Sequence, residues 1–167
     1  VKKLNSIIFK YNKNFEIDLI KLKKTITNQN IKLLIFANPN SPTGTIINKK
    51  KMLNIIKTAN KNNCTVLLDE AYYPYSKLTL INEINNYKNL VVVRSLKSFG
   101  LSGLRVGYLV SNKNFVEKAS SYRPLYEVNS VGAFLFSELL KNYSKVKKSI
   151  TILLLAKKYF IKELNKR

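Results

Sequence analysis

Two short segments of this sequence carry side chains that could do chemistry together. In the first, Asp69 follows four apolar residues typical of a buried strand, and Tyr72 comes three positions later. A carboxylate at the end of a buried strand needs a cationic or hydrogen-bonding partner, because it loses hydration there. Taken alone, Asp69 and Glu70 at a strand end are more commonly a helix cap or a loop ion pair.

The second segment centres on Lys97, which follows a strand-like run of valines and precedes Phe99 and Gly100. In apolar surroundings the ammonium form of a lysine is disfavoured, and the free amine is nucleophilic enough to attack a carbonyl carbon. Arg105 offers a guanidinium group for a phosphate, and Ser95 could add a hydroxyl to the same anion. The spacing therefore indicates covalent carbonyl chemistry beside an anion site, although most lysines in a lysine-rich chain are simply solvated.

The elements that would position these residues alternate between apolar strands and amphipathic helices. Strand-like runs occupy residues 32–37, 65–68, 90–93 and 104–110, and helical patterns cover residues 52–59, 113–121, 130–142 and 144 to the end. This alternation predicts an α/β domain with a largely parallel sheet. Ligands of such sheets bind in the loops beyond the carboxyl ends of the strands. The segments 38–44, 69–72 and 95–100 all fall in such loops.

Four segments together resemble the class I/II, fold-type I aminotransferases, most closely their histidinol-phosphate aminotransferase-like branch. They are Asn-Pro-Asn-Ser-Pro-Thr-Gly at 38–44, Asp-Glu-Ala-Tyr at 69–72, Lys-Ser-Phe-Gly-Leu-Ser-Gly-Leu-Arg-Val-Gly-Tyr at 97–108, and Arg-Pro-Leu-Tyr-Glu-Val-Asn at 123–129. Their order and spacing agree with the family over about residues 7–165. The resemblance implies a three-layer αβα fold with a mostly parallel sheet, part of the large domain of a fold-type I enzyme that uses pyridoxal 5'-phosphate (PLP).

The resemblance also implies a role for each candidate residue. Lys97 would hold PLP covalently and shuttle protons between the substrate and the cofactor. Asp69 would pair with the pyridinium nitrogen, and Tyr72 would bond the phenolic oxygen. Ser95 and Arg105 would hold the phosphate. No metal ligand set is implied.

Three positions depart from the family pattern. Ser41 stands where the family often has an asparagine that contacts the phenolic oxygen, so Ser41 is a candidate cofactor contact or leaves that contact to Tyr72. Leu96 replaces the serine or threonine common directly before the lysine. Glu127 replaces an asparagine common in the histidinol-phosphate branch, so the substrate need not be histidinol phosphate.

The reaction implied is transfer of an amino group between an amino acid and a keto acid or keto phosphate, with a homodimer expected for the complete protein. Family members are much longer than this chain. Residues 1–143 would form the central part of the PLP-binding large domain, and residues 144–167 a long helix leading toward a small domain outside the chain. Two alternatives stay open: a PLP-dependent phospho-amino-acid decarboxylase, and a degenerate or basic binding module without catalysis.

The net charge of +21 motivates the second alternative, since 30 basic residues face only 9 acidic ones and there is no histidine. Phosphate neutralisation by such an excess drives non-specific nucleic-acid binding. However, the lysines fall in small scattered clusters typical of a solvated surface, and arginine is scarce. Nucleic acid is therefore the less favoured partner, after small-molecule donors and acceptors. The single cysteine, Cys64, favours a reducing, cytoplasmic setting, and no membrane-spanning run is apparent.

Overall fold

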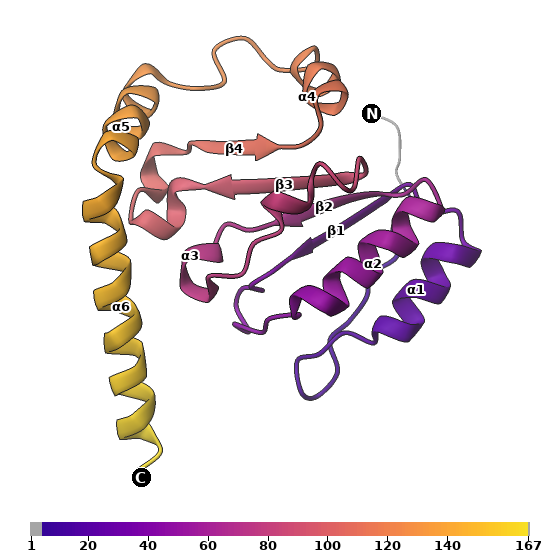
Figure 1. The fold of residues 1–167 in the computed structure, drawn as a ribbon, viewed down its shortest axis with the longest axis horizontal. Coiled ribbons are helices and arrows are strands. Elements are labelled where there is room, and N and C mark those ends of the chain that lie inside the picture. The colour runs from indigo at the N-terminus through magenta and orange to yellow at the C-terminus, as the bar shows by residue number, and fades with distance from the viewer. Residues whose placement is uncertain (1–4, 167) are drawn as a thin grey trace.

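A four-stranded sheet forms the centre of the molecule in a computed structural model that describes residues 5–166 (Figure 1). Its strands are β1 (Leu33–Ala37), β2 (Thr65–Asp69), β3 (Leu90–Ser95) and β4 (Gly107–Val110). They lie in the order β1-β2-β3-β4, with β1, β2 and β3 parallel and β4 antiparallel to β3. The α/β prediction with a mostly parallel sheet is thereby confirmed.

Six α-helices connect and flank the strands within residues 5–166. They are α1 (Leu19–Asn28), α2 (Lys49–Lys61), α3 (Tyr73–Ser76), α4 (Lys113–Ser120), α5 (Ser130–Lys141) and α6 (Tyr143–Leu164). The sequence patterns did not predict α1 or α3. The predicted strand at 104–110 is three residues too long, because Ser102–Leu104 forms a 3-10 turn and Arg105 takes a left-handed backbone conformation with φ 55°.

Helices α1 and α2 cover one face of the sheet. The side chain of Asn48 caps α2 by accepting a hydrogen bond from the amide of Lys51, which satisfies a free N–H of the first turn. The apolar stripe predicted for this helix is confirmed, since it packs into the main core. That core includes Met52, Ile55, Ile56 and Ala59 from α2, Val66 and Leu68 from β2, and Leu90 and Val92 from β3.

Helix α4 lies over the opposite face, above β3 and β4. Strand side chains alternate between faces, so Val93 and Leu109, which are register partners, point away from the main core. They line a cavity together with Val116 of α4. Helices thus occupy both faces and give three layers. On this face, no helix among residues 5–166 covers β1, as the 63% exposed side chain of Ile35 indicates.

A second, smaller core lies under the loop that joins β3 to β4. Leu96, Val106 and Leu139 are buried together, with Phe136 of α5 and Val146 of α6 packed against them. This cluster anchors the loop that carries Lys97 to helices α5 and α6, which follow it in the sequence.

Helix α6 leaves the body of the molecule after its first two turns (Figure 1). Ile150 is its buried residue, whereas Ile152, Leu153, Leu155, Tyr159, Phe160, Ile161 and Leu164 are all exposed. The helix predicted from residue 144 onward is therefore present to Leu164. Whether it leads toward a further domain stays a prediction. No helix among residues 5–166 is long and apolar enough to cross a membrane.

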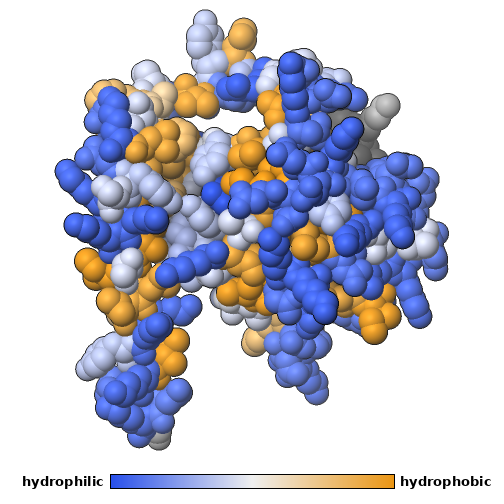
Figure 2. All heavy atoms as spheres, in the orientation of Figure 1, coloured by the Kyte–Doolittle hydropathy of each residue, from blue (hydrophilic) through white to orange (hydrophobic). Residues whose placement is uncertain are grey.

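Figure 2 shows that hydrophilic side chains dominate the surface over α1 and α2, while apolar patches gather along α5 and α6. The lysines of α1 and α2 lie mostly exposed on that surface, among them Lys21, Lys24, Lys49, Lys50, Lys51, Lys57 and Lys61. Ion pairs involve few of these lysines, and within residues 5–166 the acidic partners are scarce. The excess positive charge is accordingly a solvated face.

Candidate active site

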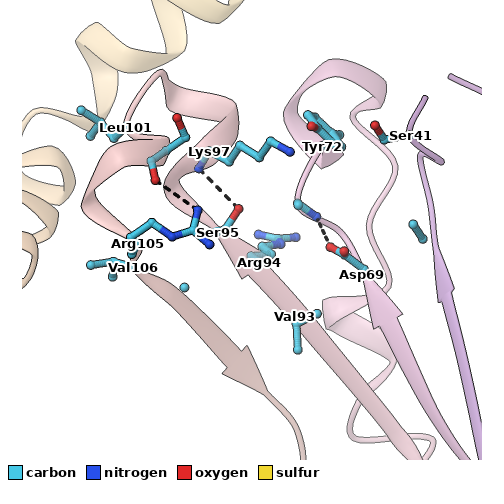
Figure 3. A pocket seen from close by; sticks show the side chains of 14 residues that line it. Ser41, Asp69, Tyr72, Val93, Arg94, Ser95, Lys97, Leu101, Arg105 and Val106 are labelled. Atoms are coloured by element: carbon cyan, nitrogen blue, oxygen red, sulfur yellow. Dashed lines mark hydrogen bonds between the residues drawn. The ribbon is translucent and has the colours of Figure 1, made fainter. Parts of the chain in front are cut away.

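All six residues predicted to contact a cofactor line one cavity of about 520 Å³ (Figure 3). The strand register explains the convergence, because Ala37, Asp69 and Val93 are neighbours on β1, β2 and β3 and face the same side. The loops that leave these strand ends supply the other groups. The six residues are Ser41, Asp69, Tyr72, Ser95, Lys97 and Arg105.

Asp69 is the last residue of β2 and forms part of the cavity wall. Its Oδ1 accepts a hydrogen bond from the amide of Ala71 at 2.8 Å, which fixes the carboxylate in place. No cation of residues 5–166 forms an ion pair with it, so its charge is available to a ligand in the cavity. Asp69 does not cap a helix, because α3 begins after Tyr72 and has no side-chain cap, whereas the neighbouring Glu70 does form an ion pair, with Arg94.

The loop after β1 brings Ser41 to the cavity. Asn38 is buried and holds this loop at its base, because its side chain exchanges two hydrogen bonds with the backbone of Ile47. Farther along, the Asn40 side chain donates to the Thr43 hydroxyl at 2.7 Å. Hydrogen bonds among its own side chains thus hold the Asn-Pro-Asn-Ser-Pro-Thr-Gly loop together. Ser41 is exposed on this loop, and its hydroxyl faces Tyr72 (Figure 3).

Lys97 and Tyr72 meet at the mouth of the cavity, where the Lys97 Nζ lies 5.1 Å from the centre of the Tyr72 ring. Hydrogen bonding from the Lys97 amine lowers the pKa of the Tyr72 phenol, and the Ser41 hydroxyl acts in the same direction. The arrangement gathers an amine, a phenol and a hydroxyl within reach of one ligand.

The prediction that Lys97 lies in apolar surroundings is wrong. The Lys97 side chain is exposed, and its neighbours Leu96 and Ser98 take the buried positions instead. Leu96 is 1% exposed and packs in the small core with Val106 and Leu139. Leu96 stands where the family commonly has a serine or threonine, and its side chain packs in this core instead of offering a hydroxyl. Because Leu96 points inward, Lys97 is turned toward the cavity.

Ser95 and Arg105 lie on the side of the cavity formed by β3 and the β3–β4 loop. The Ser95 Oγ accepts a hydrogen bond from the Lys97 amide at 3.4 Å. The Arg105 guanidinium is exposed, and its left-handed backbone is unusual for a residue with a side chain. Gly107, the register partner of Ser95, is required here, since a Cβ would lie 2.9 Å from the Arg94 carbonyl oxygen.

Further functional side chains lie here that the sequence patterns did not single out. Ser102 adds a hydroxyl to the cavity wall near Arg105; its place in the glycine-rich stretch before Arg105 was the available signal. Arg94 also reaches the wall, and its Nη2 pairs with the buried Glu70 Oε2 at 2.8 Å. Glu127, by contrast, lies outside this cavity, where it pairs with Arg123.

The residues that line this cavity fit PLP by the chemistry of their groups. A carboxylate suits a protonated ring nitrogen, and an amine suits an aldehyde carbon. A guanidinium with hydroxyls beside it suits a phosphate. The carboxylate of Asp69 and the guanidinium of Arg105 line the same cavity, with Lys97 and Tyr72 at its mouth. No metal-binding cluster of His, Cys, Asp or Glu occurs within residues 5–166.

A family comparison assigns the class of this protein. The model of the aminotransferase class I and II family matches residues 3–167, so the chain belongs to that family. Among its relatives, the histidinol-phosphate aminotransferase of Thermoanaerobacter sp. (strain X514) is 36% identical over 154 residues, covering 92% of this chain and 42% of the relative. The enzyme of the same name from Buchnera aphidicola subsp. Cinara cedri is 32% identical and covers 98% of this chain and 46% of the relative.

Solved structures agree with this assignment. The histidinol-phosphate aminotransferase from Clostridium acetobutylicum superimposes with a TM-score of 0.85 at 27% identity, over 96% of this chain and 49% of that one. The L-threonine-O-3-phosphate decarboxylase from Porphyromonas gingivalis gives 0.71 at 25% identity, over 81% of this chain and 42% of that one. The chain therefore spans less than half the length of the relatives it matches.

Proposed function

We propose that this chain forms the cofactor-binding centre of a PLP-dependent aminotransferase of the histidinol-phosphate aminotransferase type. One observation carries the proposal: Asp69 and Tyr72 of one segment converge with Ser95, Lys97 and Arg105 of a second segment, and with Ser41 of a third, on one cavity. The stability of the fold does not require an amine, a carboxylate, a phenol and a guanidinium to line one cavity, so their convergence favours a binding function.

When bound, PLP supplies an electrophilic carbon and a ring that accepts the electron pair left by a departing substrate proton. Lys97 binds that carbon through its amine and moves the proton at the substrate alpha carbon. Asp69 keeps the ring nitrogen protonated, because its carboxylate stabilises the positive charge. The Tyr72 hydroxyl donates a hydrogen bond to the phenolic oxygen of the cofactor ring, and the Ser41 hydroxyl faces that of Tyr72.

Ser95 and Arg105 hold the phosphate on the opposite side of the cavity, with Ser102 as an additional hydroxyl. A guanidinium binds phosphate through paired hydrogen bonds, which fixes orientation as well as affinity. These residues would hold the cofactor at its phosphate and at its ring nitrogen, which would leave its reactive carbon accessible to Lys97.

The substrate we propose is histidinol phosphate as amino donor, with a keto acid as acceptor. Support comes from the names of the relatives that are more than 30% identical. Glu127 stands outside the cavity, so its departure from the branch pattern leaves the cofactor site unchanged. A homodimer of the complete protein stays a prediction from the resemblance.

Product analysis of the full-length protein tests this function. Histidinol phosphate and a keto acid are incubated with the PLP-loaded protein, and the keto phosphate and new amino acid are measured by mass spectrometry. Wild type is expected to form both products in equal amounts, and Lys97→Ala to lose at least about a thousandfold in rate, because it lacks the amine. Transamination by Lys97→Ala at the wild-type rate would disprove the proposal.

Decarboxylation of a phosphorylated amino acid is the second candidate, favoured by the likeness to the Porphyromonas gingivalis decarboxylase. It would use the same lysine and aspartate. The two reactions differ in their products, since a decarboxylase releases carbon dioxide from O-phosphothreonine without forming a keto acid. Carbon dioxide release without keto product from the same protein would favour this alternative.

A further inference from the structure

Two segments carry four of the six candidate cofactor contacts in the cavity. Asp69 and Tyr72 belong to the segment that leaves β2, whereas Ser95 and Lys97 belong to the segment that leaves β3. Parallel pairing of β2 and β3 fixes the strands only as far as Asp69, which lies opposite Val93. Beyond that point the positions of Tyr72 and Lys97 depend on contacts between the two loops.

The first contact lies where the loops begin. Glu70 has no exposed side-chain surface, and its Oε2 accepts from Arg94 Nη2 at 2.8 Å and from Nε at 3.1 Å. Its Oε1 accepts from the amide of Leu80 at 2.7 Å, and the Thr79 hydroxyl donates to Oε2 at 2.8 Å. Each carboxylate oxygen thus has a partner, which makes this pair a fixed point behind the cavity.

The second contact lies at the far end of the loops. The Tyr75 hydroxyl of α3 donates to the Ser98 carbonyl oxygen at 2.7 Å. Ser98 directly follows Lys97, and its backbone lies in the 3-10 turn Leu96–Phe99. Tyr75 does not line the cavity, so its contact with the lysine segment is made from outside the ligand space.

We propose that Tyr75 is a positioning residue for Lys97, with the Glu70–Arg94 pair as the fixed end against which it acts. Tyr72 lies between the contact residues Glu70 and Tyr75 in one segment, and Lys97 lies between Arg94 and Ser98 in the other. The buried Leu96 anchors the lysine loop on one side of Lys97. The Tyr75 contact adds a restraint on the other side, which sets the direction of Lys97 relative to Tyr72. The inference rests on the proposed function, since it concerns the aim of the cofactor-binding lysine.

A matched pair of variants separates positioning from general support of the fold. Tyr75→Phe removes the hydroxyl that holds Ser98. Tyr73→Phe removes a hydroxyl from the same helix that lies 3.2 Å from the Tyr143 hydroxyl and does not touch the lysine loop. Both variants keep the aromatic ring, so both are expected to keep the circular-dichroism spectrum and close to the wild-type stability.

Two readouts report where Lys97 points. The first is the pH titration of the Tyr72 phenol, followed by NMR on chains with carbon-13-labelled tyrosine, which needs no cofactor. The second is the rate at which PLP becomes attached to Lys97, measured by borohydride quenching and peptide mass spectrometry. Tyr75→Phe is expected to move the Tyr72 titration toward that of free tyrosine and to slow attachment about fivefold, the effect of losing one hydrogen bond.

Tyr73→Phe is expected to leave the Tyr72 titration and the attachment rate within about twofold of wild type. The proposal is overturned if Tyr75→Phe matches Tyr73→Phe in the Tyr72 titration. If wild-type Lys97 takes up no PLP at all, the proposed function fails, while the Tyr72 titration still decides whether Tyr75 positions the lysine. The two failures are therefore distinguishable.

Discussion

Lys97 and Tyr72 form the chemical centre of the site, and each alters the other. An amine that hydrogen-bonds to a phenol favours its ionised form, because the ammonium is attracted to the phenolate. The Lys97 amine therefore lowers the pKa of Tyr72, and Ser41 adds to the effect. A phenol with a lowered pKa is a stronger hydrogen-bond donor to a cofactor oxygen.

Removal of the amine is expected to reverse this shift. In Lys97→Met the Tyr72 phenol should titrate at higher pH than in wild type, since the amine that contributes most to lowering its pKa is gone. Tyrosine-selective NMR titration between pH 8 and 12 measures it. Lys77→Met, a change at an exposed lysine just after α3, serves as the control. An unchanged Tyr72 titration in Lys97→Met would show that the two groups do not interact.

Residue identities in the site were predictable, but their environments were not. The types and spacing of Lys97, Ser95 and Arg105 indicated only carbonyl chemistry beside an anion site, and the assignment of PLP came from the resemblance of the four segments to the aminotransferase family. The exposure of Lys97 was not predictable, since the flanking apolar residues gave no sign that Leu96 and Ser98 would turn inward and leave Lys97 outside. Which neighbour of a residue is buried depends on α5 and α6, which lie far along the sequence.

The buried Glu70–Arg94 pair joins β2 to β3 at the scale of elements. Removal of one partner leaves an uncompensated charge, because Glu70 has no exposed side-chain surface and Arg94 only 10%. Glu70→Ala is expected to lower the free energy of unfolding by about 3–5 kcal/mol. Urea denaturation measures the loss. The double variant Glu70→Leu with Arg94→Met should recover most of it, and failure to recover would show that packing rather than charge sets the cost.

Gly107 allows β4 to lie close to β3 beside Ser95. A methyl group at this position would lie 2.9 Å from the backbone oxygen of Arg94, which cannot move without shifting β3. Gly107→Ala is therefore expected to cost about 1–3 kcal/mol in unfolding free energy.

The matched control for that substitution is Gly103→Ala, because no atom lies within 4 Å of a methyl group placed there. It should stay within about 0.5 kcal/mol of wild type in the same urea titration. Equal losses in the two variants would contradict the close approach of β4 to β3.

Elements with a clear apolar pattern could be predicted from sequence, whereas α1 and α3 could not. The apolar stripe of Met52, Ile55, Ile56 and Ala59 correctly predicted α2, and the run of valines correctly predicted β3. Helix α1 escaped prediction because its lysines and threonines obscure an apolar face that buries only Leu22 and Ile26. The strand boundary at Gly107 depended on the left-handed conformation of Arg105, which no local pattern required.

For the whole molecule, the contact between α3 and α6 links the body to the long final helix. Burial raises the pKa of Tyr73 to about 12, and its hydrogen bond with Tyr143 of α6 acts in the same direction. Because the unfolded chain loses this proton near pH 10 and the folded chain only near pH 12, the contribution is complete below pH 10. It is lost as the pH rises from 10 through 12.

The stability of wild type is thus expected to fall more steeply between pH 10 and 12 than that of Tyr73→Phe, which has no phenol to ionise. Thermal unfolding at several pH values in this range measures the difference between the two slopes. The other ionisable side chains are present in both chains, so the comparison reports on Tyr73 together with its hydrogen bond to Tyr143. Parallel curves would mean that Tyr73 ionises at its ordinary pKa.

Large apolar side chains lie exposed on the second face of β1 and along α6, at Leu33, Ile35, Leu155 and Phe160 among others. Exposed apolar surface of this kind is typical of interfaces with other parts of a protein or with a partner. The chain spans less than half the length of its relatives. The alternation of strands and helices within it therefore did not predict how much apolar surface would lie exposed. The charge of +21 was legible from composition, and its distribution over α1 and α2 follows from their polar faces.

The claim that Lys97 is the cofactor-binding residue is tested most directly by mapping where PLP attaches. The folded chain is incubated with PLP, reduced with borohydride and digested, and peptides are read by mass spectrometry, with Lys97→Ala alongside. We expect one dominant cofactor-sized increment on the peptide containing Lys97, absent from Lys97→Ala. An increment spread evenly over the exposed lysines, or none on a chain that circular dichroism shows to be folded, would contradict the assignment.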